Sequence, residues 1–187
     1  MPQSKNESAT MNDVVNDNRI EHSIVNCIFE CVEIQIKNLK YMSYIKVYVH
    51  YVWSTKNRFP FLNDSIRSQL FAHIRENAKT KNIYIDFING YTDHVHVLVS
   101  LNDDLSIGRI AQLIKGESSH WINQLQLTTS KFEWQDEYLA IGVGDDKLNI
   151  VRNYIARQVE HHSKVTFEEE YNKFIERYGF EIVKKSI

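Results

Sequence analysis

The chain has 187 residues, of which 43% are hydrophobic and 25% are charged, and its formal net charge at pH 7 is −2. This length and composition predict one globular domain with a core of its own, and the near-neutral charge excludes a basic surface spread over the whole molecule as a nucleic-acid signature. No run approaches the roughly 18 apolar residues of a membrane span, and the first residues lack the apolar core of a signal peptide, so we expect a cytoplasmic location and no membrane contact.

The first 41 residues are interpreted as an appendage to that domain. Residues 1–19 are rich in Asn, Ser and Asp and poor in large apolar side chains, which predicts disorder. The apolar content rises between residues 20 and 39, but neither a helical nor a strand period fits it. Met42 is followed by a strongly predicted strand and is a possible start of the working protein. We therefore expect the domain to span residues 42–187.

The domain opens with a predicted strand, helix and strand. Residues 45–53 are dense in β-branched and aromatic side chains, which favour a strand. Asn63 or Asp64 can cap a helix whose apolar residues recur every four positions. These apolar residues are Ile66, Leu70, Ile74 and Ala78. Residues 83–88 predict a second strand, and Asn89-Gly90 is a strong signal for a hairpin turn that leads directly into a third strand.

The third predicted strand, residues 94–99, carries two histidines. Because successive side chains of a strand point to opposite faces, His94 and His96 are predicted to project together from one face. The valines between and after them then project from the other face, toward the core. Two histidines alone are a weak signal for a site, since this spacing also occurs by chance.

The order of the remaining elements defines the fold. Ser106 predicts the start of a second helix, and residues 138–143 predict a fourth strand. Strand, helix, strand, strand, helix, strand is the order of the split βαβ, ferredoxin-like unit. We therefore expect an α+β fold with an antiparallel four-stranded sheet, in which the first and third strands are central and both helices cover one face.

The other face of the sheet is expected to receive the C-terminal helices. Residues 147–164 predict a helix capped by Asp145 or Asp146. Its apolar stripe consists of Leu148, Val151, Ile155 and Val159. A polar group lies roughly 60 to 100° round from this stripe and consists of Tyr154, Gln158, His161 and His162. Residues 166–169 form a capping box that opens a final helix, which Gly179 ends.

These side chains allow metal and nucleophile chemistry. Two imidazoles and the amide oxygen of Gln158 suit an exchangeable divalent ion, Mg²⁺ or Mn²⁺, better than structural zinc. Such an ion stabilises the charge that builds up during in-line displacement at a phosphodiester. Tyr154, one helical turn from Gln158, would then lie beside the ion as a nucleophile. The phosphotyrosine ester would keep the bond energy, so that rejoining would need no ATP.

For several of these residues other interpretations stay open. Tyr154 taken alone is also compatible with packing, and Gln158 with a solvated surface. His161 and His162 suit phosphate contact or a structural role better than direct ligation of an ion. Asp93 alternates to the face opposite the histidines, so it reaches them only if the end of the strand bends.

His94-Val95-His96 together with residues 154–158 resembles the HUH single-strand DNA transposases with one catalytic tyrosine, the small enzymes of IS200-type insertion sequences. The likeness covers residues 42 to about 180 and departs from the family in the leader before Met42. Its other parts are the segments 53–58, 115–119, 134–138 and 168–171. Each segment is modest alone, but their order and spacing together are specific.

The resemblance implies a ferredoxin-like palm with a C-terminal catalytic helix, and a transposase that cleaves and rejoins single-stranded DNA at insertion-sequence ends. It implies Tyr154 as the nucleophile of a 5′-phosphotyrosine intermediate that leaves a 3′-hydroxyl, and a divalent ion held by His94, His96 and Gln158. It also implies a homodimer in which the tyrosine helix can serve the partner's histidines, with residues 142–144 as a hinge, and binding of hairpins near the element ends. The candidate DNA contacts are Lys56, Arg58, Lys115, His161 and His162.

Two alternatives remain. A rolling-circle replication initiator or relaxase uses the same histidine and tyrosine chemistry, but such enzymes usually carry larger or additional domains. A non-catalytic ferredoxin-like module would bind nucleic acid by stacking bases on strand aromatics such as Tyr48 and Trp53. Metal-dependent cleavage separates the enzymes from the binding module.

Overall fold

The computed structural model describes residues 29, 30 and 44–180. The chain divides into the units Met1–Tyr44 and Ile45–Ile187, and every element described below belongs to the second unit. The predicted appendage, residues 1–41, lies outside the described residues apart from 29 and 30, so its disorder and its boundary stay predictions. Among the described residues, no helix is long and apolar enough to cross a membrane.

Four strands form one antiparallel sheet in the order β2-β3-β1-β4. The strands are β1 (Tyr48–Ser54), β2 (Tyr84–Gly90), β3 (His94–Ser100) and β4 (Leu139–Val143). The helices are α2 (Asp64–Thr80), α3 (Ile107–Gln124), α4 (Leu148–Ala156), α5 (Gln158–His162) and α6 (Phe167–Tyr178), with short 3₁₀ turns η1 (Lys56–Arg58) and η2 (Asp145–Lys147). The predicted ferredoxin-like α+β fold is confirmed, and β1 and β3 are the central strands.

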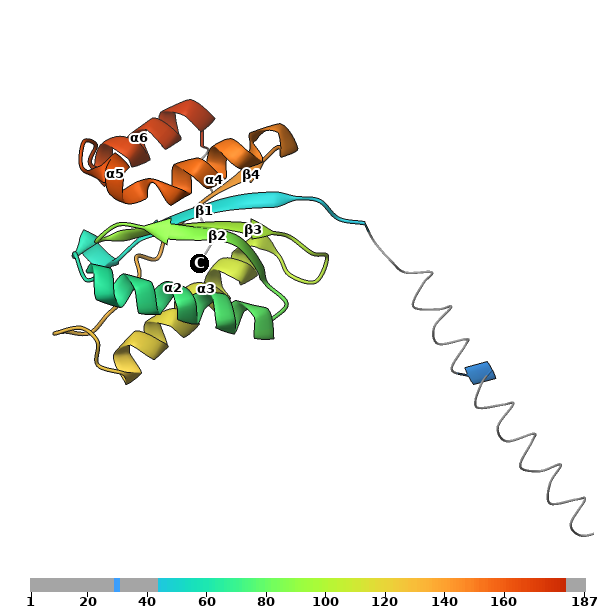
Figure 1. Ribbon diagram of the computed structural model, residues 1–187, viewed down its shortest axis with the longest axis horizontal. Helices are drawn as coiled ribbons and strands as arrows, with labels where there is room; N and C mark the ends of the chain where they lie inside the picture. The colour runs from blue at the N-terminus through green and yellow to red at the C-terminus, as the bar shows by residue number, and fades with distance from the viewer. Residues whose placement is uncertain (1–28, 31–43, 181–187) are drawn as a thin grey trace, which may run out of the picture. The chain divides into compact units, whose positions relative to one another are not determined.

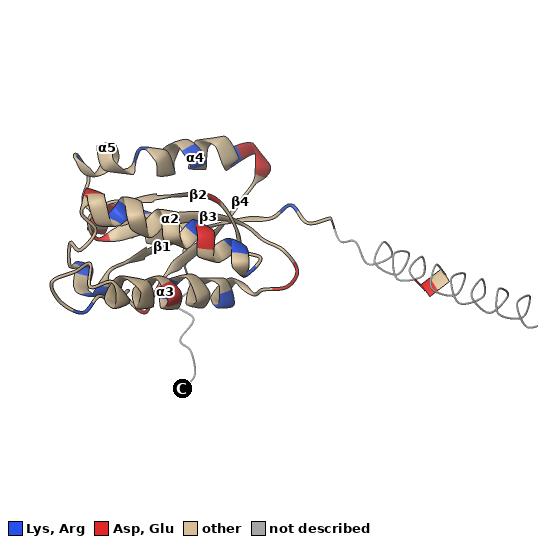
Figure 2. Cartoon of the chain, turned by 60° about the horizontal axis from the view of Figure 1, so that its bottom comes forward, with Lys and Arg blue, Asp and Glu red and all other residues tan. Residues whose placement is uncertain are grey.

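The main core lies between the sheet and helices α2 and α3, which share one face of the sheet (Figure 1). Both helices begin where the sequence predicts, because Asn63 accepts a hydrogen bond from the Ile66 amide at 3.0 Å and Ser106 accepts one from the Arg109 amide at 3.2 Å. The valines of β3 point into this core as expected. On the outer sides of α2 and α3, charges of both signs are interspersed (Figure 2), in keeping with the near-neutral net charge.

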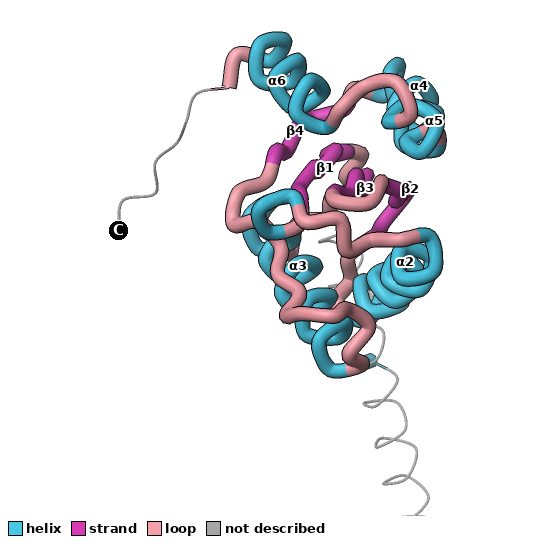
Figure 3. The backbone as a smooth tube through the Cα atoms, turned by 90° about the vertical axis from the view of Figure 1, so that its left-hand side faces the viewer, coloured by secondary structure: helices cyan, strands magenta, loops and turns pink. Residues whose placement is uncertain are grey.

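The opposite face of the sheet is covered by α4, α5 and α6 (Figure 3). Two small apolar clusters hold them there. Leu98 of β3 packs against Leu148 and Ile155 of α4, and Val52 of β1 packs against Phe167 at the start of α6. The histidines of β3 therefore lie under a second layer made by the C-terminal quarter of the chain.

The predicted turn at Asn89-Gly90 is wrong. Both residues belong to β2, where they pair with His96 and Val95, and the chain reverses at residues 91–93 instead. Gly90 is needed for close approach, since a Cβ there would lie 2.2 Å from the His94 carbonyl oxygen. The Asn89 side chain donates a hydrogen bond to the Ala156 carbonyl at 2.9 Å and so ties β2 to the end of α4.

The helix predicted over residues 147–164 is also interrupted. Asp145 and Asp146 fall in η2 rather than at the cap, and α4 begins after Lys147. At Arg157 the backbone leaves the helical region (φ −97°, ψ 19°), and α5 starts one residue later at Gln158. The capping box of α6 and the left-handed Gly179 (φ 54°) at its end are both confirmed.

Candidate active site

The floor of the site is a group of three buried histidines. His94 and His96 are fully buried on the face of β3 that the C-terminal helices cover, and His50 projects from the neighbouring strand β1. The Nε2 atom of His50 lies 3.1 Å from Nδ1 of His96, and their rings stack with centroids 5.2 Å apart. A neutral His96 that donates through Nδ1 keeps the lone pair of Nε2 directed away from the strand.

Asp93 orients His94 in the same way. It lies just before β3, outside the regular strand, and its Oδ1 is 2.7 Å from Nδ1 of His94. The bend at the strand end that the sequence required is therefore present. With Nδ1–H directed to Asp93, Nε2 of His94 keeps its lone pair and faces Oε1 of Gln158 at 3.4 Å.

One wall of the site comes from α4 and α5. Gln158 is fully buried at the start of α5, and its amide donates to the Tyr154 carbonyl at 3.4 Å. The Tyr154 ring meets the His96 ring edge-on at 5.7 Å and the His161 ring at 5.5 Å between centroids. The predicted set of two histidines, tyrosine and glutamine is thus brought together within one chain.

The opposite wall contains a residue that the sequence reasoning missed. Glu170 of α6 is buried, and its Oε2 lies 3.1 Å from Nε2 of His162 and 3.6 Å from Nε2 of His96. Its Oε1 lies 3.8 Å from Nε2 of His161. His50 was missed as well, although it shares the face of β1 on which Val52 points toward the C-terminal layer. Neither residue has a local motif that marks it.

The cluster at this site consists of His50, His94, His96, His162 and Glu170. Burial sets the protonation of four of its members. It lowers the pKa of His50 and of His96 well below the usual value, with neighbouring histidines adding to the effect. It lowers the pKa of His162 to about 4 and raises that of Glu170 to about 7. These three imidazoles are therefore neutral near pH 7, as metal ligation requires.

The polar atoms of the cluster fit a cation. Within the described residues, His96 Nε2, His162 Nε2 and both carboxylate oxygens of Glu170 are buried without a hydrogen-bond partner. Four potential ligand atoms lie within 4.8 Å of one another. They come from His94, His96, His162 and Glu170, one from each residue. Buried acceptors that face one another are costly unless a positive centre lies between them. The donor set therefore suits a divalent ion.

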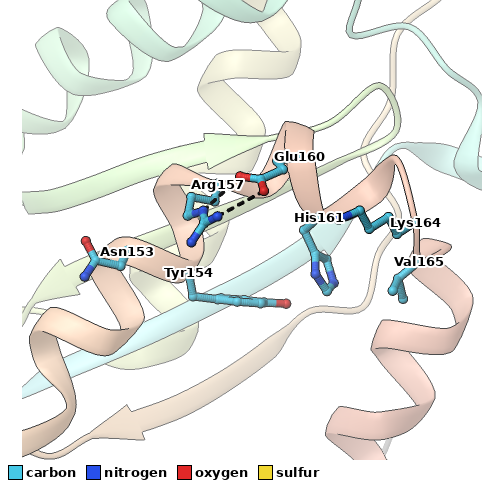
Figure 4. A pocket seen from close by; sticks show the side chains of 7 residues that line it. All are labelled: Asn153, Tyr154, Arg157, Glu160, His161, Lys164 and Val165. Carbon is cyan, nitrogen blue, oxygen red and sulfur yellow. Dashed lines mark hydrogen bonds and ion pairs between the residues drawn. The ribbon is translucent and has the colours of Figure 1, made fainter.

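Tyr154 and His161 line two pockets, and the second of them also reaches His50 and Glu170. The first, of about 340 Å³, contains Arg157, His161 and Lys164, and Figure 4 shows the Tyr154 ring extending along it toward His161. The second, of about 350 Å³, lies between α4 and α6 and is lined on the α6 side by basic and aromatic residues. These residues are Lys173, Phe174, Arg177 and Tyr178.

The lysines and arginine predicted to contact DNA gather beside residues 133–138. Lys56 pairs with Asp136 at 3.0 Å, Arg58 pairs with Glu168 at 3.3 Å, and Lys115 donates to the Asp136 carbonyl at 2.8 Å. Both carboxylates are exposed, so neither ion pair is strongly held.

The structure places the two C-terminal histidines and the strand aromatic Trp53 in different surroundings. The His161 side chain is 31% exposed beside Tyr154, whereas the His162 side chain is only 2% exposed and faces the cluster. Trp53, which the binding-module alternative requires for base stacking, is buried in the main core.

Comparison with known proteins identifies a family whose model spans most of the described domain. The family model described as Transposase IS200 like matches residues 43–158, a span that includes both histidines of β3, Tyr154 and Gln158. No curated protein matches the chain.

Two solved structures resemble the fold. A candidate transposase from Deinococcus radiodurans R1 is 21% identical, with a TM-score of 0.52 over 63% of this chain and 94% of its own. A REP-associated tyrosine transposase bound to a REP hairpin is 16% identical, with a TM-score of 0.51 over 78% of this chain and 90% of its own.

Proposed function

The chain belongs to the IS200-like transposase family, and we propose that Tyr154 is the nucleophile of its strand-transfer reaction. The family's reaction is transposition of single-stranded DNA, in which element ends are cut and rejoined through a 5′-phosphotyrosine intermediate. The observation that carries our assignment is the Tyr154 ring, which lies against His96 inside the matched region. The family match also favours a transposase over the replication-initiator alternative.

The reaction is a pair of displacements at phosphorus. The Oη atom of Tyr154 attacks the phosphodiester, a Tyr–O–P bond forms, and the bond to the 3′-oxygen breaks. The phenolic proton leaves Tyr154, and the departing 3′-oxygen takes up a proton to become a hydroxyl. In rejoining, a 3′-hydroxyl from another strand attacks the same phosphorus and releases Tyr154, so that the number of phosphoester bonds is conserved.

We propose that His94, His96 and Gln158 hold a divalent ion, Mg²⁺ or Mn²⁺, at this centre. Support comes from the 3.4 Å approach of two potential ligand atoms, His94 Nε2 and Gln158 Oε1, and from the unpartnered Nε2 of His96 among the described residues. When bound, such an ion polarises a phosphoryl oxygen and offsets the negative charge that builds up on it. Asp93 and His50 fix the rings that present the two imidazole nitrogens.

Single-stranded DNA is the proposed substrate, and the pockets beside Tyr154 offer it two kinds of contact. Basic side chains such as Lys173 and Arg177 suit the phosphates, and Tyr178 offers an aromatic surface to a base. His161 is a further proposed contact at the pocket next to Tyr154. His162 is buried and faces the cluster, so it does not offer a phosphate contact in this arrangement.

A second proposed contact surface lies farther along the sheet. Lys56, Arg58 and Lys115 suit the phosphates of a hairpin, because the exposed partners of Lys56 and Arg58 leave their ion pairs open to exchange. The solved relative bound to a REP hairpin supports proposing hairpin ends as targets here too.

The test uses labelled single-stranded oligonucleotides from the flanks of the chain's own gene, with Mg²⁺, Mn²⁺ or EDTA. We expect a covalent protein–DNA band that requires a divalent ion and disappears in Tyr154→Phe but persists in Tyr84→Phe, the same change at an exposed tyrosine of β2. Tight binding by the wild type with no covalent band on any flank would contradict the proposed nucleophile.

We also propose a homodimer, with residues 142–144 as the connection through which the tyrosine helix could reach a partner's histidines. The short distance between Tyr154 and His96 within one chain supports catalysis inside each subunit as the resting arrangement. Mixing His94→Ala with Tyr154→Phe separates the two arrangements. Recovery of cleavage would require sharing between subunits, whereas two inactive proteins that stay inactive when mixed as dimers would support self-contained sites.

A further inference from the structure

Two side chains from beyond the family match reach the histidine cluster. The match ends at residue 158, and His162 and Glu170 follow it at the end of α5 and in the first turn of α6. Their side chains are only 2% and 4% exposed. A polar group is rarely buried so completely without a partner that satisfies it.

The hydrogen bonds of His162 leave it as an acceptor toward the cluster. Its Nδ1 lies 2.8 Å from the Val165 carbonyl, which can only accept, so this nitrogen carries the proton of the neutral ring. Its Nε2 therefore presents a lone pair to Glu170 Oε2, 3.1 Å away. His96 Nε2 faces the same carboxylate oxygen at 3.6 Å.

One shared proton does not satisfy this arrangement. A proton between His162 and Glu170 would serve that contact, but it would leave Nε2 of His96 and the second carboxylate oxygen buried without partners among the described residues. A divalent cation can accept lone pairs from all of these groups together. Their ligand atoms lie within 4.8 Å of one another, close to the separation of two ligands on opposite sides of one ion at about 2.0 to 2.4 Å each.

We propose that His162 and Glu170 are additional ligands of the divalent ion, which joins β3 to the C-terminal layer within one subunit. This inference rests on the proposed function, which places a divalent ion at the cluster. It adds the identity of two further residues that bind the ion. A set of three imidazoles, one carboxylate and one amide oxygen favours Mn²⁺ or another first-row transition ion over Mg²⁺.

Titration of metal-free, full-length protein with Mn²⁺ by calorimetry tests the ligand set. We expect Glu170→Gln and His162→Gln each to weaken binding at least tenfold, because a neutral amide oxygen is a weaker ligand for a transition ion than a carboxylate or an imidazole nitrogen. Glu176→Gln is the matched control, since it changes an exposed carboxylate on the same helix and should bind as the wild type does. We further expect wild-type affinity for Mg²⁺ to be at least tenfold lower than for Mn²⁺.

Thermal melting distinguishes a ligand from a structural ion pair. If Glu170 is a ligand, Glu170→Gln should melt at or above the wild-type temperature without metal, because the substitution removes a buried carboxylate that faces other hydrogen-bond acceptors. The rise in melting temperature on adding Mn²⁺ should be smaller for this variant than for the wild type. A lower melting temperature without metal, combined with unchanged Mn²⁺ affinity, would overturn the inference and assign Glu170 to an ion pair with His162.

His94→Ala separates this inference from the proposed function. Loss of Mn²⁺ binding in His94→Ala with wild-type binding in Glu170→Gln would overturn the additional ligand alone. A wild-type protein that binds no Mn²⁺, in a melting assay as well as by calorimetry, would overturn both the ion and its extra ligands.

Discussion

His50 controls the orientation of His96, and replacing it tests whether the ion site depends on residues that do not touch the ion. Among the described residues, the His96 side chain makes one hydrogen bond, between its Nδ1 and Nε2 of His50, at 3.1 Å between two buried rings. His50→Leu removes that partner, keeps a side chain of similar size and leaves Nδ1 of His96 buried and unpaired. An unsatisfied buried polar group costs about 1 to 3 kcal/mol.

That cost translates into a measurable loss of affinity. Because about 1.4 kcal/mol corresponds to a tenfold change, we expect Mn²⁺ binding to His50→Leu to weaken roughly 10- to 100-fold, the range typical of lost partners of metal-ligating histidines. Calorimetric titration of metal-free protein measures this change. His50→Gln, whose amide can replace the lost partner, should recover much of the affinity.

Folding must be separated from ring orientation in this experiment. The leucine side chain would pack beside the rings of Phe174 and Tyr154, whose centroids lie 6.1 and 6.3 Å from that of His50. The metal-free His50→Leu variant should therefore stay folded, with a melting temperature lowered by no more than the several degrees expected from one unpaired buried nitrogen. Equal Mn²⁺ affinity in a folded His50→Leu variant would refute the argument that the His50 contact orients His96.

Three further predictions address the core, the hairpin and the DNA surface. Leu70→Ala should lower the free energy of unfolding by about 2 to 5 kcal/mol, measured by denaturant titration, because Leu70 is fully buried. Leu125 is half-exposed, so Leu125→Ala should change the free energy of unfolding by less than about 1 kcal/mol. Gly90→Ala should lower the free energy of unfolding and weaken Mn²⁺ binding, since its Cβ would lie 2.2 Å from a backbone oxygen of β3. Gly116→Ala should be neutral or stabilising, because among the described residues nothing lies within 4 Å of the added Cβ. Arg177→Gln should weaken single-stranded DNA binding and reduce by about one the slope of log affinity against log salt concentration.

The histidine strand could be predicted because its information is local. Alternation alone places both histidines of β3 on one face and the valines on the other, and the sheet confirms it. The four-residue spacing of Tyr154 and Gln158 likewise survives the break at Arg157, because the amide of Gln158 still reaches back to the Tyr154 carbonyl.

The rest of the site depends on how distant segments meet. The β1–β3 register carries His50 beside His96, 46 residues away in sequence. Glu170 meets the cluster because α6 packs on β1 through Phe167, and three consecutive glutamates open that helix, so the sequence does not single out the buried one. Asn-Gly is a strong turn signal and so predicts a hairpin at residues 89–90, yet here Gly90 serves close strand approach and Asn89 anchors α4.

The arrangement of layers links catalytic competence to docking of the C-terminal helices. The sheet with α2 and α3 has a large core of its own, whereas α4 and α6 are held by two small apolar clusters, by Asn89, and by the bidentate pair of Arg152 with Asp86 at 2.7 and 2.9 Å. Elements with less buried apolar contact open more readily than the main core. Tyr154 and Glu170 both belong to this layer, whereas His94 and His96 belong to the sheet, so any opening that admits a DNA strand also separates the nucleophile from these two proposed ligands. An ion bound by both layers would favour the closed state in which the two meet.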